Sequence, residues 1–311
     1  MVYSPVWGSR YATILIKYFV QSVRTLAILF RDRPRVVFVM APPVVACAPV
    51  WLYCLVRRAQ FVIDAHTGAF LDPEWKRVSF LQRFFSRRAT TTIVTNRHLQ
   101  QLVEEWGAEA TIVTDVPVCF AEPEHVELSG AFNVTVVSSF ANDEPTAMIL
   151  EAAAHCPDIR FYMTGNPSDL ESRVLKSKPD NVQLTGFLSD ARYVGQLQAS
   201  DAVMVLTTRD HTMQRGAYEA VYLGKPVITS NFELLRTSFS KGTVYVDSTV
   251  ADIVRGIREM RSDVSRFQEE VDHLRDEKLQ QWDAVAASLL ERLGVTDVHV
   301  NKECLNEEIV V

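Results

Sequence analysis

The sequence predicts an α/β protein built from two doubly wound, Rossmann-like domains. Short apolar runs alternate with helical patterns from about residue 35 to residue 260, an order typical of a parallel sheet with helices on both faces. The alternation stops once, at the acidic, proline-containing segment 121–129, and then begins again. A length of 311 residues also favours two domains over one.

The first half of the chain begins with an amphipathic helical pattern, Tyr11–Phe30. The uncharged stretch 36–56 that follows is long enough to cross a membrane. Three prolines interrupt it, Pro42, Pro43 and Pro49, which favours a buried strand, a turn and a helix instead. The expected strands are Val36–Met40, Phe61–Asp64, Thr91–Thr95 and Thr111–Val113, with a helix at Arg97–Trp106.

After the interruption the same alternation continues, and a long charged helical pattern, Val264–Leu293, follows it. The expected strands are Phe132–Val137, Arg160–Thr164, Val182–Thr185, Ala202–Leu206, Pro226–Ile228 and Thr243–Val246. The expected helices are Pro145–Ala154, Ala191–Ala199, Gly216–Leu223 and Thr249–Met260. Open parallel sheets bind ligands beyond the carboxyl ends of their strands, so two such units facing each other would suit the joining of two substrates.

The net charge of -6 is unevenly distributed along the chain. Residues 1–100 contain 14 Lys/Arg and four Asp/Glu, about +10, whereas residues 101–311 contain 18 and 34, about -16. A basic first half indicates an anionic partner. Alternatively, its arginines simply end helices, where cations are favoured. Nucleic acid is not expected as a partner, because the acidic half would face the same cleft.

The five cysteines show neither a CxxC pair nor a cluster with histidine; they are Cys47, Cys54, Cys119, Cys156 and Cys304. Their odd number and their spacing argue against a disulfide framework and a zinc site. Residues 1–10 lack the basic and apolar regions of a cleavable signal peptide. These observations predict a cytoplasmic protein with reduced, buried thiols.

The segment 202–230, AVMVLTTRDHTMQRGAYEAVYLGKPVITS, carries the clearest chemical pattern. A buried strand is followed by the polar loop Thr207–Gln214 and then by a helix that contains Glu219. Free N–H groups at such a helix start favour an anion such as a diphosphate. The carboxylate of Glu219 can accept two hydrogen bonds from a diol such as ribose, or it can merely pair with the helix dipole.

This block resembles the donor-site signature of retaining GT-B glycosyltransferases of family 4. That family shows a Glu, seven residues, a second Glu, a helix end of small residues and then G-x-P-V. Tyr218–Ala220 and Gly224–Ile228 match the second half. The resemblance implies that Glu219 binds the donor ribose. The first Glu falls at His211, so the resemblance leaves the contact with the donor sugar to His211 or to the neighbouring Asp210.

Further matches extend from the early strands to Leu293. Thr185–Asp190 is similar to the family's base-binding strand, so the resemblance implies that Gly186, Phe187 and Leu188 contact the nucleobase. Gln281–Val285 resembles the closing helix that crosses back to the first domain. The implied donor site also includes the loop and helix start of the signature block, namely Thr208, Arg209, Thr212, Arg215 and Gly216.

The loop after the first strand of the second domain departs from the family pattern. The family has Gly-Arg and then Lys-Gly there, and the bases neutralise the donor diphosphate. Here Val137–Pro145 contains no base and two acids. The remaining hydrogen-bond donors are Ser138, Ser139 and Asn142. Arg209 or Arg215 could supply the missing charge. Alternatively, Asp143 or Glu144 could hold a metal ion, which the family seldom needs. The two acids could also simply mark the start of a helix.

In the first domain, the segment 63–70 ends a strand and opens a loop. His66 resembles the family's cleft histidine, which approaches the sugar or phosphate of the donor. As neutral imidazole it could accept a proton from the acceptor, and as imidazolium it could stabilise the leaving phosphate. Alternatively, Asp64 and His66 only hydrogen-bond the loop. Gly68 and Asp72 are the expected acceptor-side residues, with Asp72 orienting an acceptor hydroxyl.

The resemblance implies a hexosyltransferase that moves a sugar from a UDP- or GDP-sugar to a glycan or lipid-linked acceptor, with retention, in polysaccharide or glycoconjugate synthesis. No divalent metal is expected as a cofactor. The expected parts are an acceptor-side domain at 1–128, a donor domain at 129–262, a crossing helix at 263–293 and a mobile tail at 294–311. A degenerate binding or regulatory subunit and a nucleotide-sugar epimerase are the alternatives.

The start of the chain is the last departure from the family. The usual first strand and glycine-rich loop have no counterpart before Tyr11–Phe30, so a smaller sheet, a truncated start or completion by another chain are the alternatives. If the acceptor is lipid-linked, the basic half and this helix would sit at an anionic membrane surface. The expected location is then peripheral, on the inner face of the membrane.

Overall fold

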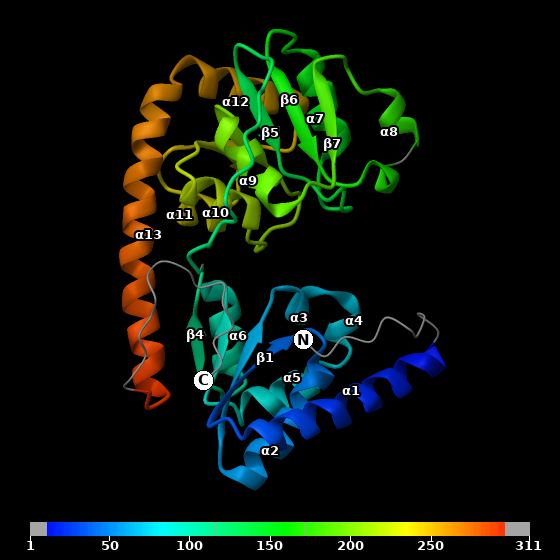
Figure 1. The fold of residues 1–311 in the computed structure, drawn as a ribbon, viewed down its shortest axis with the longest axis vertical. Helices are drawn as coiled ribbons and strands as arrows, with labels where there is room; N and C mark the ends of the chain where they lie inside the picture. Colours follow the sequence, from blue (N-terminus) through cyan, green and yellow to red (C-terminus); the bar gives the residue numbers. More distant parts are fainter. Residues whose placement is uncertain (1–10, 115, 171, 296–311) are drawn as a thin grey trace. The chain divides into compact units, whose positions relative to one another are not determined.

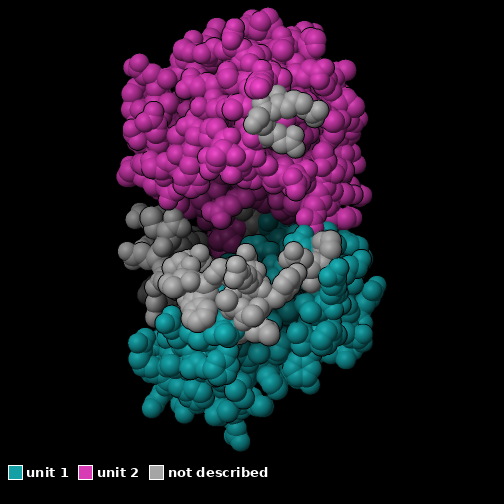
Figure 2. All heavy atoms as spheres, turned by 90° about the vertical axis from the view of Figure 1, so that its right-hand side faces the viewer, with its two compact units in different colours: residues 1–115, 285–300, 307–311 teal, residues 116–284, 301–306 magenta. Residues whose placement is uncertain are grey.

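The computed structural model describes residues 11–114, 116–170 and 172–295, and these form two compact units (Figure 1). Unit 1 comprises the described residues up to 114 together with 285–295, and unit 2 comprises those from 116 to 284. Figure 2 colours the atoms of each unit separately. Of the expected tail 294–311, residues 296–311 lie outside the described residues.

Unit 1 contains a parallel four-stranded sheet in the order β1-β2-β3-β4. Its strands are β1 (Val36–Ala41), β2 (Gln60–Ala65), β3 (Thr91–Val94) and β4 (Ala110–Ile112). Its helices are α1 (Tyr11–Asp32), α2 (Cys47–Arg57), α3 (Gly68–Leu71), α4 (Pro73–Lys76), α5 (Ser79–Ser86) and α6 (Arg97–Glu105), with a short 3-10 turn at Val44–Ala46. The sequence-based strands agree with these to within a residue or two. Helices α3 and α4, of four residues each, are too short to give a helical period, and α5 was also not predicted.

The apolar stretch 36–56 folds as a strand, a turn and a helix, as its prolines predicted. Val39 and Ala41 of β1 are buried against Val50 and Tyr53 of α2 in the core of unit 1. In the part of the chain that the structure describes, no helix has the length and apolar character needed to cross a membrane.

Unit 2 contains a parallel six-stranded sheet in the order β10-β9-β8-β5-β6-β7. Its strands are β5 (Asn133–Val136), β6 (Arg160–Thr164), β7 (Val182–Gly186), β8 (Ala202–Val205), β9 (Val227–Ser230) and β10 (Thr243–Val246). Its helices are α7 (Thr146–Ala154), α8 (Ser172–Lys176), α9 (Asp190–Ala199), α10 (Arg215–Tyr222), α11 (Glu233–Ser238), α12 (Val250–Ser262) and the first part of α13 (Val264–Arg292), with a 3-10 turn at Pro167–Asp169.

Alternate residues of the central strands of unit 2 face different helices. Met204 and Ile228 pack with residues of α7 and α12. Val203 and Val205 pack with residues of α10 and α11 on the other face. Each face of the sheet is therefore covered, which is why these strands read as continuous apolar runs. The predicted doubly wound architecture is confirmed for unit 2.

The strand order places a topological switch point in the middle of this sheet. From β5 the chain builds β6 and β7 on one side and then returns to place β8 on the other side of β5. The connections leaving β5 and β8 therefore diverge, and a crevice beyond the carboxyl ends of such strands is where open α/β sheets generally bind ligands. The loops 137–145 and 206–214 lie there.

Helix α13 connects the two units, as the sequence predicted. Its early residues Val271 and Leu274 are buried in unit 2, while its residues from 285 onward group with unit 1. Within unit 1, Arg292 pairs with Glu109 at 3.2 Å, and the Gln60 amide donates to the carbonyl oxygen of Leu293 at 3.5 Å.

Candidate functional site

The two loops at the switch point of unit 2 are joined through Asp143. The Thr207 hydroxyl donates to the Asp143 carboxylate at 3.0 Å. The backbone N–H and the hydroxyl of Thr208 donate to the Asp143 carbonyl oxygen at 2.6 and 3.0 Å. Thr207 is buried, and its own N–H donates to Ser230 on β9. Asp143 therefore holds the loop after β5 against the loop after β8.

Glu144 belongs to the loop 137–145, in which the family that the sequence resembles has basic residues that bind phosphate. Its carboxylate accepts hydrogen bonds from the N–H of Ser139 at 3.0 Å and of Phe140 at 2.9 Å, and from the Ser139 hydroxyl at 2.8 Å. The Ser138 hydroxyl donates to it as well. Phe140 has a φ of 59°, so successive N–H groups converge in the manner of an anion-binding nest. In this structure the anion in the nest is the protein's own carboxylate.

This geometry changes the interpretation of the loop 137–145. Ser138 and Ser139 were expected to donate hydrogen bonds to a ligand, but both hydroxyls donate to Glu144. Asn142 is exposed in the same loop. Among the described residues, no group of three or more His, Cys, Asp or Glu side chains is placed to hold a metal ion. The two acids thus organise the loop internally.

The loop after β8 contains the candidate catalytic pair Asp210 and His211. His211 has a φ of 58°, and its N–H donates to the Asp210 carboxylate at 2.6 Å. Its Nε2 lies 3.8 Å from the other Asp210 oxygen. The Thr212 hydroxyl donates to the Asp210 carbonyl oxygen at 3.4 Å, and the Arg209 N–H donates to the Thr207 hydroxyl at 3.1 Å. These hydrogen bonds fold the loop into a turn, in which the side chains of Asp210 and His211 lie next to each other.

Glu219 lies at the second turn of α10, and only 12% of its side chain is exposed. One carboxylate oxygen accepts from Arg215 Nε at 2.9 Å, and the other accepts from the Tyr193 hydroxyl at 2.6 Å. Burial and the neighbouring Glu219 carboxylate raise the pKa of Tyr193, so its hydroxyl stays protonated. Tyr193 was not predicted from the sequence. It lies 26 residues before Glu219, and no spacing rule links the two helices.

Gly216 brings α10 close to the strand beside it. A Cβ atom built on this glycine would lie 2.7 Å from Cγ1 of Val137, which is closer than real Cβ atoms approach. Only glycine allows the first turn of α10 to rest against the residue that follows β5. Arg215, one residue earlier, remains exposed.

The predicted nucleobase loop follows β7. Gly186 has a φ of 75°, a conformation that glycine adopts without strain. Phe187 projects from this turn with 91% of its surface exposed, and Leu188 is partly buried. Ser189 then caps α9, accepting from the Arg192 N–H at 3.4 Å. The turn thus offers backbone groups and an exposed aromatic ring at the carboxyl end of β7.

The three predicted residues of unit 1, His66, Gly68 and Asp72, follow the carboxyl end of β2 along the chain. His66 Nε2 lies 3.7 Å from the Asp64 carboxylate, and the His66 N–H donates to the Ala41 carbonyl oxygen at 2.9 Å. Burial raises the pKa of Asp64, and His66 opposes that rise. A Cβ atom on Gly68 would lie 2.5 Å from an Asp72 carboxylate oxygen, so Asp72 folds back over Gly68.

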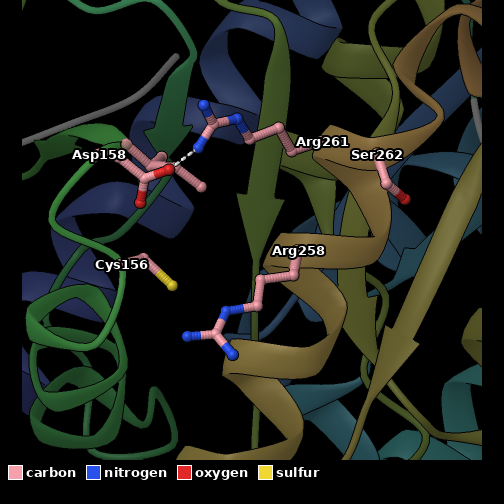
Figure 3. Close-up of a pocket in the computed structure, with 6 residues that line it drawn as sticks. Cys156, Asp158, Arg258, Arg261 and Ser262 are labelled. Atoms are coloured by element: carbon pink, nitrogen blue, oxygen red, sulfur yellow. Dashed lines mark hydrogen bonds and ion pairs between the residues drawn. The ribbon is translucent and has the colours of Figure 1, made fainter.

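A separate hollow of about 390 Å³ lies at the opposite end of unit 2 (Figure 3). Cys156 and Asp158 come just before β6, and Arg258 and Arg261 come from the last turns of α12. Arg261 pairs with Asp158, and Arg258 donates to the His155 carbonyl oxygen at 3.2 Å. These arginines end a helix, where cations are favoured. The hollow is at the amino end of β6 and is not part of the switch-point site.

A family model matches the part of the chain that contains this site. Residues 131–263 match the family model described as Glycosyl transferases group 1. The match spans the sheet of unit 2, including both switch-point loops and Glu219. No curated protein matched the chain.

Solved structures resemble nearly the whole chain. Sucrose-phosphate synthase from Thermosynechococcus elongatus has a TM-score of 0.70 and 14% identity, over 93% of this chain and 80% of that one. Anabaena HepE, solved with UDP and glucose, has a TM-score of 0.68 and 14% identity, over 89% and 82%. A Listeria monocytogenes protein named after UDP-N-acetylglucosamine 2-epimerase has a TM-score of 0.65 and 11% identity, over 95% and 83%. The chain therefore has the GT-B fold, and its residues 131–263 are similar to the glycosyl transferases group 1 family.

Proposed function

We propose that this protein is a hexosyltransferase that moves a sugar from a nucleotide-sugar donor to a glycan or lipid-linked acceptor, with retention of configuration. The observation that carries the proposal is the place of Glu219. Its largely buried carboxylate lies on α10, directly after the loop that leaves the switch point of a glycosyl transferases group 1 domain. A buried carboxylate at such a crevice suits recognition of a ribose diol.

The remaining donor contacts follow from the same crevice. The exposed ring of Phe187 suits stacking on a nucleobase. Because the nest at Ser139 and Phe140 already holds Glu144, the donor diphosphate would bind instead at the loop after β8. The backbone of this loop, Arg209 and Arg215 would meet the negative charge that develops on the leaving group. Asp210 and His211 would contact the donor sugar.

On the acceptor side, His66 and Asp72 are the proposed functional residues. His66, held beside Asp64, would accept the acceptor proton or stabilise the leaving phosphate. Asp72 would orient the acceptor hydroxyl. We infer UDP as the first nucleotide to test, because the structural relative HepE was solved with UDP and with UDP-glucose.

A lipid-linked acceptor on the inner face of a membrane would suit the surface of unit 1. Ile16, Phe19 and Val23 of α1 are 48%, 70% and 50% exposed. They recur every three or four residues, so they form one apolar stripe. The nearby Arg24 is exposed, as is Arg31, which pairs with Asp32 at 2.6 Å. An apolar stripe flanked by cations favours an anionic bilayer.

The membrane proposal is tested by sedimentation with vesicles. We expect wild type to bind vesicles that contain phosphatidylglycerol and to bind neutral ones weakly, with Phe19→Asp abolishing binding. Leu279→Asp is the control, since Leu279 is 40% exposed on α13 within unit 2. Equal binding to neutral and anionic vesicles would contradict the proposal.

The proposed activity is tested first by thermal shifts with UDP, GDP, ADP and their sugars, on wild type and Glu219→Ala. A nucleotide at 100 times its Kd should stabilise the wild type by ~2.7 kcal/mol, and Glu219→Ala should lose most of that. Donor turnover with a retained anomeric configuration, read by NMR, would then establish transfer. Release of an epimerised sugar without acceptor would favour the epimerase alternative, and stabilisation without turnover would favour a binding subunit.

A further inference from the structure

The Glu219 carboxylate, the proposed ribose-binding group, lies closer to the Tyr193 hydroxyl than to Arg215 Nε. The tyrosine hydroxyl donates to one carboxylate oxygen at 2.6 Å. Such a distance is typical of a hydrogen bond from a hydroxyl to an ionised carboxylate. Burial raises the pKa of Tyr193, so the hydroxyl remains a donor throughout the neutral pH range.

The two partners of Glu219 differ in how firmly they are held. The ring of Tyr193 packs against the core of unit 2 that includes Leu197, Val203 and Tyr218. The Arg215 side chain is 83% exposed, so water and a bound anion can compete for its guanidinium. Tyr193 therefore fixes the direction of the Glu219 carboxylate, whereas Arg215 can exchange its ion pair with Glu219 for one with a phosphate.

A carboxylate has about four lone-pair directions. One oxygen of Glu219 is engaged by Tyr193, which leaves further directions on both oxygens for the two hydroxyls of a vicinal diol. The orientation of these remaining lone pairs depends on the torsion angle of the Glu219 carboxylate group, which the Tyr193 hydroxyl restrains. A phenylalanine at position 193 would keep the packing but release this torsion angle.

We propose that Tyr193 is a positioning residue that orients Glu219 toward the ribose diol of the nucleotide, and so sets the preference for ribonucleotides over 2′-deoxyribonucleotides. This inference rests on the proposed function, in which Glu219 binds ribose. It adds a residue from α9 that touches no substrate and acts only through Glu219.

The test compares the Kd of UDP, GDP and ADP with those of their 2′-deoxy forms by calorimetry, for wild type, Tyr193→Phe and Tyr245→Phe. The last is the matched control, because the Tyr245 hydroxyl also donates a 2.6 Å hydrogen bond, to the Phe239 carbonyl oxygen within unit 2, with a longer contact of 3.5 Å to the Arg236 carbonyl oxygen. We expect the wild type to prefer the ribonucleotide about tenfold or more, as a lost hydrogen bond to a charged group predicts. Tyr193→Phe should reduce that ratio to about twofold, and Tyr245→Phe should leave it unchanged.

A double-variant cycle separates positioning from general damage. If Tyr193 acts only through Glu219, adding Tyr193→Phe to Glu219→Ala, which removes the carboxylate, should change the affinity for the ribonucleotide no further. A Tyr193→Phe protein that keeps the wild-type ratio would overturn the inference and leave the proposed function intact. A wild type that binds none of the three nucleotides would overturn the proposed function itself.

Discussion

The Thr207 hydroxyl donates a 3.0 Å hydrogen bond to the Asp143 carboxylate, although the two residues belong to loops that leave different strands. Because these strands, β5 and β8, flank the switch point, this bond sets the separation of the two loops that border the crevice. The shape of the proposed donor site therefore depends on a residue that need not touch the donor.

Asp143→Ala should loosen this crevice. The variant leaves the buried Thr207 hydroxyl without its acceptor, which should cost about 1–2 kcal/mol and lower the Tm by a few degrees. The affinity for nucleotide should fall as well. Scanning calorimetry and nucleotide titration measure both effects. Asp169→Ala is the control, since Asp169 is exposed in the same unit; an equal loss of stability in both variants would contradict the role of Asp143.

Glu144→Gln should destabilise unit 2 by about 1–2 kcal/mol, because the N–H groups of Ser139 and Phe140 would lose a charged acceptor. Urea unfolding followed by circular dichroism measures this change. Glu144→Ala would leave the nest empty. We therefore expect pyrophosphate to stabilise Glu144→Ala more than it stabilises wild type, and an equal effect on both proteins would argue against a nest that accepts anions.

Gly216→Ala should overpack the contact between α10 and the residue after β5. The new methyl group would lie 2.7 Å from Val137 Cγ1, and such overpacking typically costs about 1–3 kcal/mol. The double variant Gly216→Ala/Val137→Ala should recover part of the loss, because it removes the clashing methyl groups. Thermal unfolding of both variants measures this, and a double variant less stable than the sum of the single ones would count against a local clash.

Asp64 should make the stability of unit 1 depend on pH. Burial raises its pKa in the folded state above the ordinary value of 3.8, so folding is favoured at low pH, where the group is protonated in both states. That contribution is lost as pH rises through the folded-state pKa. Asp64→Asn should therefore raise the Tm at pH 7 and have little effect below pH ~3.8. Since 43% of the side chain is exposed, we expect a small effect; a lower Tm at pH 7 would contradict this sign.

The fold could be predicted from the sequence because its signals are local. Apolar runs such as Val203–Leu206, the helix end at Gly224 and Pro226, and the position of Glu219 after a polar loop all depend on neighbouring residues. The contacts that shape the site do not. Tyr193 meets Glu219, and Glu144 turns back onto Ser139, only through the folded arrangement. The sequence alone therefore left the acids of the loop 137–145 open between a metal site and a plain helix start. In the structure, both carboxylates accept hydrogen bonds from other residues of the protein.

Phe187 gives a direct test of nucleobase binding. Because 91% of the surface of Phe187 is exposed, Phe187→Ala removes almost no packing. The free energy of unfolding of the variant should therefore stay within about 0.5 kcal/mol of the wild-type value. Stacking of one base on an aromatic side chain contributes about 1–3 kcal/mol, so the Kd for the nucleotide should rise about tenfold. Phe80→Ala is the matched control, since Phe80 is 65% exposed on α5 of unit 1.

The same variant also distinguishes which part of the donor this loop contacts. If Phe187 stacks on the base, Phe187→Ala should weaken UDP and uridine by the same factor, because the diphosphate is bound elsewhere. Phe187→Tyr, which keeps the ring, should restore both affinities. A loss confined to UDP would place the loop near the phosphates, and an unchanged affinity for both ligands would remove Phe187 from the donor site.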